Sequence, residues 1–97
     1  MSGNRDYCLT TLRKNYPKIQ SFGVTRLGLF GSMARDEATP ESDLDFVVEF
    51  NIKTFDAFMD LKIFLEELFQ RRVDLVTTEA LKPRLRPKIL GEAIYVS

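Results

Sequence analysis

The chain has 97 residues and 44% hydrophobic content, which suits one compact domain over residues 1–97 with a small packed core. Fourteen basic and fourteen acidic residues balance to a formal net charge of zero, which argues against a direct nucleic-acid partner. The sequence has no histidine and one cysteine, Cys8, which excludes a histidine general base, a His-ligated zinc site and an internal disulfide. Because no apolar run approaches the length of a membrane span, we expect a cytoplasmic protein without membrane contacts.

Hydrophobic periodicity divides the chain into alternating helices and strands. The clearest strand covers residues 43–50, where apolar and acidic residues alternate. The clearest helix covers residues 54–69, whose aromatic residues Phe55, Phe58 and Phe64 are expected in the core. The order of the elements predicts an α/β (α+β) class, with helices covering the apolar face of a sheet. In chain order we expect first a helix over 5–20 shortened by Pro17, a strand over 24–30, a short helix capped by Ser32 and a loop over 38–41. The strand over 43–50 and the helix over 54–69 follow. The chain then continues with a strand over 72–76, a partly helical stretch over 81–91 and a strand over 93–96.

Three aspartates lie within apolar strands, each on the face opposite the aliphatic residues. Asp43 and Asp45 are two positions apart, so they point the same way and their charges repel unless a cation holds both ionised. Hard carboxylate oxygens favour Mg²⁺, and Asp74 on a neighbouring strand would complete a catalytic site for two ions that assists displacement at phosphorus. On pattern alone, a solvated strand face explains Asp43 and Asp45 as well as metal binding does. The presence of Asp74 and of a turn at Gly31 and Ser32 favours the interpretation of Asp43 and Asp45 as metal ligands.

A candidate phosphate-binding turn joins the strand over 24–30 to the short helix that follows it. Backbone N–H groups at a helix start favour phosphate oxygens, Gly31 permits a close approach, and the Ser32 hydroxyl adds a donor. Arg35, one turn further along, is either a phosphate ligand or a surface ion-pair partner, and the sequence does not choose between these roles. The turn is not a Walker loop, because the chain contains no GxxxxGK pattern.

These motifs carry a resemblance to a known family. The run Gly-Leu-Phe-Gly-Ser-Met-Ala-Arg over 28–35, followed by Ser-Asp-Leu-Asp over 42–45, resembles the signature of the polymerase-beta-type nucleotidyltransferase superfamily, and within it the minimal nucleotidyltransferase family. Val-Asp-Leu-Val over 73–76 is similar to the strand that carries the family's third aspartate. The chain departs from the pattern at Asp36, where relatives often have glycine. Asp tolerates a helix-end conformation better than most residues, so we expect the site to be retained.

The resemblance implies a nucleotidyltransferase fold, in which a small mixed β-sheet has helices packed on one face and the active site on the other. It implies that ATP is the substrate and that Asp43, Asp45 and Asp74 form the catalytic and Mg²⁺-binding set, with Asp74 also helping to activate the acceptor hydroxyl. It implies that Gly31 and Ser32 hold the triphosphate. Arg35 and Ser42 are the other candidate nucleotide-binding residues.

The resemblance also implies a biological role. Members of this family act as antitoxins: they bind a HEPN-type RNase toxin and transfer AMP to one of its tyrosines. We therefore expect a hetero-oligomer with such a toxin. Two alternatives stay open, namely a non-catalytic module that blocks its partner sterically, and a transferase acting on small molecules or RNA. Enzymes of the latter kind usually carry an extra acceptor domain, for which 97 residues leave no room.

Overall fold

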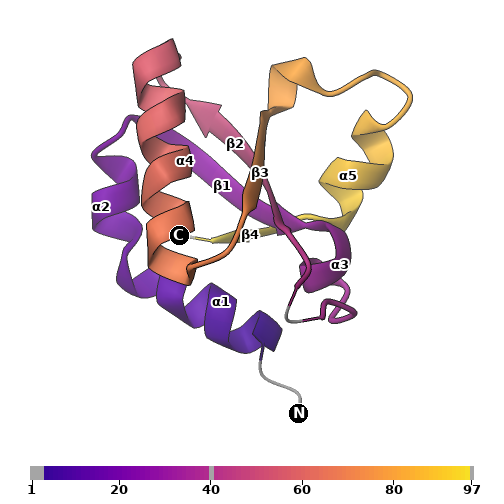
Figure 1. The fold of residues 1–97 in the computed structure, drawn as a ribbon. Helices are drawn as coiled ribbons and strands as arrows, with labels where there is room; N and C mark the ends of the chain where they lie inside the picture. The colour runs from indigo at the N-terminus through magenta and orange to yellow at the C-terminus, as the bar shows by residue number, and fades with distance from the viewer. Residues whose placement is uncertain (1–3, 40, 97) are drawn as a thin grey trace.

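The computed structural model describes residues 4–39 and 41–96, and within them four strands form one mixed sheet in the order β3-β2-β1-β4 (Figure 1). β1 pairs antiparallel with both β2 and β4, whereas β2 and β3 run parallel. A parallel pair needs a crossover connection, which α4 supplies here. The elements are α1 (Asn4–Lys14), α2 (Tyr16–Gln20), β1 (Val24–Phe30), α3 (Gly31–Ala34), β2 (Leu44–Phe50), α4 (Phe55–Phe69), β3 (Val73–Thr77), the 3₁₀ turn η1 (Thr78–Ala80), α5 (Arg86–Glu92) and β4 (Ile94–Val96).

The aliphatic face of the sheet forms the core. Side chains alternate along β2, so Leu44, Phe46 and Val48 all point to one face, where each is at most 1% exposed. Helices α1, α2 and α4 cover this face (Figure 1), which confirms the expected layer of helices. Helix α5 carries no buried residue and lies on the other side of β3 from α4, in contact with α3. The helices contribute to the core Cys8, Leu9, Leu12, Ile19, Met33, Ala34, Leu61 and Leu65.

The helix expected over 5–20 is two helices, α1 and α2, which are separated at Asn15. Pro17 lies in the first turn of α2 and does not simply shorten one long helix. Proline lacks an N–H group and restricts the residue before it, so a helix tolerates it at its start and is interrupted by it elsewhere. The Asn15 side chain donates to the carbonyl of Thr11 at 2.8 Å, which satisfies an acceptor in the last turn of α1.

Two further expectations are wrong: that Ser32 caps α3, and that Phe55 lies in the core. Helix α3 begins at Gly31 with Phe30 as its N-cap, and no side chain caps it, so Ser32 is not the capping residue. Phe55 is the first residue of α4 and is 77% exposed, whereas Phe58 and Phe64 do pack against the core. The first turn of α4 extends past the core, which leaves the ring of Phe55 in solvent. The helix itself is capped by Thr54, whose hydroxyl accepts from the backbone N–H of Ala57 at 3.0 Å.

None of the helices in the described ranges is long and apolar enough to cross a membrane.

Cys8 is buried in the core at 2% exposure, and burial raises the pKa of its thiol to about 12, although the charge of Arg71 opposes this shift. The thiol therefore stays protonated at neutral pH and serves as a packing group.

Candidate active site

Two of the three candidate aspartates, Asp45 and Asp74, lie on the sheet face opposite α1, α2 and α4. Asp45 is the second residue of β2 and stands beside Asp74, the second residue of β3, because the parallel register pairs these two positions. Asp43 is exposed and lies one residue before β2 begins. The strand register thus brings together two carboxylates that are 29 positions apart in the sequence. Asp43 lies outside the strand that was expected to carry it; its charge acts on Asp45, but among the described residues the three aspartates do not converge into one cluster.

Asp45 is half-buried, and its ionisation is opposed from several directions. Burial raises the pKa of its carboxyl to about 6, with smaller contributions from the negative charges of Asp74, Asp43 and Glu92, while Arg35 opposes the shift. Burial and neighbouring like charges both disfavour the charged form of an acid. At neutral pH the ionised carboxylates therefore repel one another, and a bound cation would relieve that repulsion.

The donor set suits a hard divalent cation. In the two stretches that the structure describes, no three His, Cys, Asp or Glu side chains converge into a ready-made metal cluster. Mg²⁺ usually takes only one or two carboxylates from a protein and completes its shell with water and substrate phosphates. The register-paired Asp45 and Asp74 offer such a pair on one open sheet face. The residues present therefore fit Mg²⁺ that arrives together with a nucleotide.

Gly31 holds the turn between β1 and α3 against Asp45. Its φ is +75°, a conformation that L side chains rarely adopt, and a Cβ placed on it would lie 2.2 Å from Oδ2 of Asp45. No side chain fits in that space without moving the carboxylate. The sequence pattern attributed Gly31 to phosphate approach alone. The structure adds that this glycine leaves room for the carboxylate of Asp45.

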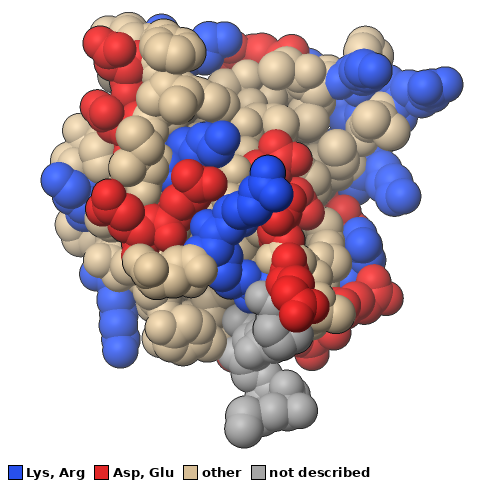
Figure 2. Space-filling view, in the orientation of Figure 1, with Lys and Arg blue, Asp and Glu red and all other residues tan. Residues whose placement is uncertain are grey.

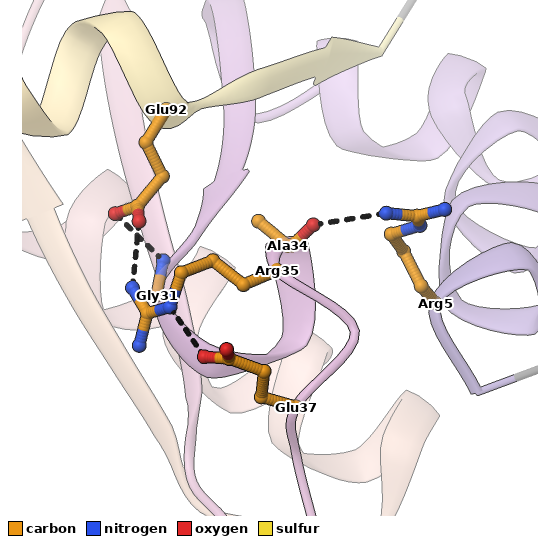
Figure 3. Close-up of polar contacts among 6 residues, drawn as sticks. All are labelled: Arg5, Gly31, Ala34, Arg35, Glu37 and Glu92. Carbon is orange, nitrogen blue, oxygen red and sulfur yellow. Dashed lines mark hydrogen bonds and ion pairs between the residues drawn. The ribbon is translucent and has the colours of Figure 1, made fainter.

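Arg35 and Glu92 meet beside this turn (Figure 3). Arg35 Nη1 lies 2.6 Å from Oε1 of Glu92, and Arg35 Nε lies 2.7 Å from Oε1 of Glu37. The backbone N–H of Gly31 donates to Oε2 of Glu92 in a long hydrogen bond of 3.4 Å. The hydrogen bond from Arg35 lowers the pKa of Glu92, and the Gly31 N–H acts in the same direction. The carboxylate of Glu92 therefore already contacts two of the groups expected to bind phosphate.

Sequence reasoning missed Glu92. The residue lies 61 positions from Gly31 and 57 from Arg35, so no local motif connects them. It ends α5, directly before the strand that returns to pair with β1. The only sequence signal was the expected terminal strand, which brings this part of the chain beside β1 without indicating which side chain reaches the turn.

A model of the nucleotidyltransferase domain matches residues 8–96. The chain belongs to this nucleotidyltransferase family. It is 41% identical over 78 residues to Protein adenylyltransferase MntA of Thermococcus cleftensis, with 79% of each chain covered. A solved structure described as a minimal nucleotidyltransferase superposes with a TM-score of 0.74 at 43% identity, covering 89% of this chain and 93% of that one. A toxin–antitoxin structure with AMP-PNP shares the fold at a TM-score of 0.66 and 22% identity, covering 95% of this chain and 71% of that one.

These comparisons confirm the family, the fold class and the assignment as a nucleotidyltransferase enzyme. The departure at Asp36 also has a structural explanation. Asp36 adopts a φ of 60°, the left-handed conformation that glycine favours and that Asp tolerates better than most other residues. The chain can therefore leave α3 at this point without a glycine.

In the nucleotidyltransferase, the loop that leads to Asp43 is fixed by Arg71. Its guanidinium donates to the carbonyls of Thr39, at 2.8 Å, and Ser42. The Ser42 hydroxyl accepts from the N–H of Thr39 at 2.9 Å and shares a second hydrogen bond of 3.1 Å with the Thr39 hydroxyl. Ser42 thus shapes the loop before the aspartates, and its contact with nucleotide stays a prediction. Ser32 lies half-buried in α3, directly after Gly31.

Acidic and basic side chains interleave on the face of the enzyme seen in Figure 2. At the site, Arg35 forms ion pairs with both Glu37 and Glu92 (Figure 3). Arg5 of α1 donates from its guanidinium to the backbone carbonyl of Ala34 at 3.2 Å and so ties the end of α3 to α1 (Figure 3). The short helix that bears Ser32 is thereby held in place from both sides.

A pair of glycine substitutions separates backbone strain from damage to the site. Gly23 and Gly31 both have positive φ, but a Cβ at Gly23 meets nothing within 4 Å. We expect Gly23→Ala and Gly31→Ala each to lower stability by about 1–2 kcal/mol, the usual penalty for an L residue in a left-handed conformation. Only Gly31→Ala should abolish nucleotidyl transfer, since it displaces Asp45. Thermal unfolding and transfer assays on both variants check this, and equal activity in the two would contradict the role assigned to Gly31.

The raised pKa of Asp45 predicts that this carboxylate opposes folding at neutral pH. The folded state binds its proton more tightly than the unfolded state, so the penalty is absent below about pH 4 and complete above about pH 6. We expect Asp45→Asn in EDTA at pH 7.5 to stabilise the protein by about 1 kcal/mol, a figure reduced for partial solvent exposure of the group, and to raise Tm by about 4–8 °C. The gain should disappear at pH 4.

Glu49→Gln is the matched control, because Glu49 lies on the same face of β2 but pairs with Arg26 at 3.5 Å. It should leave Tm unchanged or slightly lower. An Asp45→Asn variant that melts at or below the wild-type temperature at pH 7.5 would show that the carboxylates do not strain the fold.

Proposed function

We propose that this nucleotidyltransferase transfers AMP from ATP to a hydroxyl group of a partner protein in a Mg²⁺-dependent reaction. The observation that carries the proposal is the pairing of Asp45 with Asp74 on the open sheet face, directly beside the turn at Gly31. Metal-binding carboxylates and phosphate-binding donors are thereby adjacent, as an in-line displacement at phosphorus requires. The 41% identity to a protein adenylyltransferase supports the choice of AMP and of a protein acceptor.

Each residue has a distinct task in this proposal. The Gly31 N–H, the Ser32 hydroxyl and Arg35 would hold the triphosphate, while Asp43, Asp45 and Asp74 would hold Mg²⁺ against it. Asp74 lies exposed on the edge strand β3, where an acceptor can approach it from solvent. Mg²⁺, when bound, stabilises the charge that develops on the phosphoryl oxygens.

The reaction then follows from these positions. The acceptor oxygen attacks the α-phosphorus and forms a new P–O bond, while the bond from the α-phosphorus to the bridging oxygen breaks and pyrophosphate leaves. Asp74 accepts the proton of the acceptor hydroxyl. Positioning and electrostatic stabilisation provide most of the acceleration, because the protein forms no covalent intermediate.

The proposed acceptor is a tyrosine of a HEPN-type RNase toxin, and the chain acts in the cytoplasm as the antitoxin in a hetero-oligomer with it. Support comes from the name of the MntA relative and from the fold shared with toxin–antitoxin structures. The surface also offers a place for a partner to bind. Ile52 and Phe55, next to the start of α4, are 73% and 77% exposed and are candidates for contact with that partner.

A transfer assay with α-labelled ATP tests the enzyme and its acceptor class together. The purified chain is incubated with Mg²⁺, labelled ATP and host-cell extract, and label is sought in protein, RNA and small molecules. We expect label in a protein band at a tyrosine, reduced at least about 100-fold in Asp45→Asn and Asp74→Asn, consistent with loss of an electrostatic catalytic group. Glu49→Gln, a matched acid on the same face, should transfer normally.

The other outcomes separate the alternatives. Label in RNA or in small molecules would move the acceptor to another class. Full neutralisation of the toxin by Asp45→Asn, with no transfer by the wild type, would favour a module that blocks its partner sterically.

A further inference from the structure

We propose that Glu92 occupies the phosphate position of the active site in the free enzyme and competes with the nucleotide for it. The inference rests on the proposed function, because it takes Gly31 and Arg35 as ligands of the triphosphate. The new element is Glu92, a residue distant in sequence, which binds the Gly31 N–H and the Arg35 guanidinium when no nucleotide is bound. Glu92 thereby sets how tightly phosphates bind.

The contacts of Glu92 reproduce those of a phosphate group. Oε1 lies 2.6 Å from Nη1 of Arg35, and Oε2 accepts from the N–H of Gly31 at 3.4 Å, so one carboxylate uses each of its oxygens on a different donor (Figure 3). A phosphoryl group presents paired anionic oxygens to the same kinds of donor. Glu92 and a phosphate therefore cannot hold these two groups at once.

The two acids that bind Arg35 differ in a way that identifies Glu92 as the competitor. The side chain of Glu37 is 64% exposed, and Arg35 is its partner. The side chain of Glu92 is only 16% exposed and contacts Gly31 as well as Arg35. Glu37 can remain bound to Nε of Arg35 while a phosphate takes Nη1 and the Gly31 N–H. Glu92 must leave both.

The fold allows Glu92 to withdraw. It is the last residue of α5, a seven-residue helix without buried side chains. Residues 82–88, which lead into and begin this helix, are all exposed. Around Glu92, the neighbouring Ile89, Leu90 and Ala93 are half-buried and none is fully buried, so a small movement of the end of α5 disrupts little core packing. Val96 of β4 is 4% exposed and anchors the chain just beyond, so Glu92 can return to the turn once the ligand departs.

Competition of this kind acts on every ligand that uses the two donors. ATP and the leaving group pyrophosphate should both bind more weakly than they would at an open site, and pyrophosphate should leave faster. If Glu92 instead helped to hold the nucleotide or its metal, removing it would weaken both ligands. The direction of the change therefore separates the two roles.

Binding of Mg²⁺-ATP and of Mg²⁺-pyrophosphate, measured by isothermal titration calorimetry, tests the proposal. Glu92→Gln should lower Kd for both ligands about three- to tenfold, the range expected when a partly exposed ion pair and one hydrogen bond no longer compete. Glu92→Asp, which keeps the charge but shortens the reach, should lower Kd as well. Glu37→Gln is the control: it also removes one negative charge beside Arg35, but Glu37 makes no described contact with Gly31, and it should change Kd less than about twofold.

Each remaining outcome counts against the proposal. An unchanged or higher Kd in Glu92→Gln overturns it, as do equal shifts in Glu92→Gln and Glu37→Gln, which would reflect charge alone. A wild-type Kd in Glu92→Asp would also overturn it. If ATP binds but none of the variants changes Kd, only the competition fails. If neither the wild type nor any variant binds ATP or pyrophosphate, the nucleotide site itself fails.

Discussion

The carboxylates of Asp45 and Asp74 stand side by side because β2 and β3 run parallel in register, and the rest of the site is arranged around that pair. A sheet places such side chains a few ångströms apart and gives them no freedom to separate along the strand. Burial adds to their mutual repulsion and raises the pKa of Asp45 to about 6. The hydrophobic face of the same strands, packed against α1, α2 and α4, holds the register that creates this strain. Packing of the core thus keeps two carboxylates close together, an arrangement that would not persist in a free peptide.

The turn at Gly31 couples the carboxylates to the phosphate donors. Its backbone passes so close to Asp45 that only glycine fits, and its N–H points to the carboxylate of Glu92. A nucleotide that reaches the N–H of Gly31 therefore arrives next to the metal-binding acids. Glu92 contacts both Arg35 and Gly31, so a nucleotide that binds these groups has to displace its carboxylate. Mg²⁺ bound beside Asp45 would relieve the repulsion between the aspartates in the same place.

The sequence predicted the parts of the molecule that depend on local pattern. Alternation along residues 43–50 correctly placed Leu44, Phe46 and Val48 in the core and Asp45 on the opposite face, although Asp43 lies just before the strand. The aspartate spacing and the Gly-Ser turn indicated a nucleotidyltransferase, which the family match confirms. What it missed depends on contacts between distant segments. Glu92 reaches the turn across more than fifty positions, and Phe55 is exposed because α4 extends beyond the core that it packs on. The break at Asn15 lay closer to prediction, since Pro17 was recognised, but its position in the first turn of a second helix was not.

The most direct test of the account is to measure the pKa of Asp45. NMR of its ¹³C-labelled carboxyl group over a range of pH gives this pKa, with and without Mg²⁺ and a non-hydrolysable ATP analogue. We predict a pKa of about 6 in EDTA, well above the ordinary value of an aspartate, and a clear fall when Mg²⁺ and the analogue are added. The fall is expected because a cation bound beside the carboxylate favours its ionised form. A pKa that is the same with and without Mg²⁺ and the analogue would contradict the central claim that these carboxylates form the cation site of the enzyme.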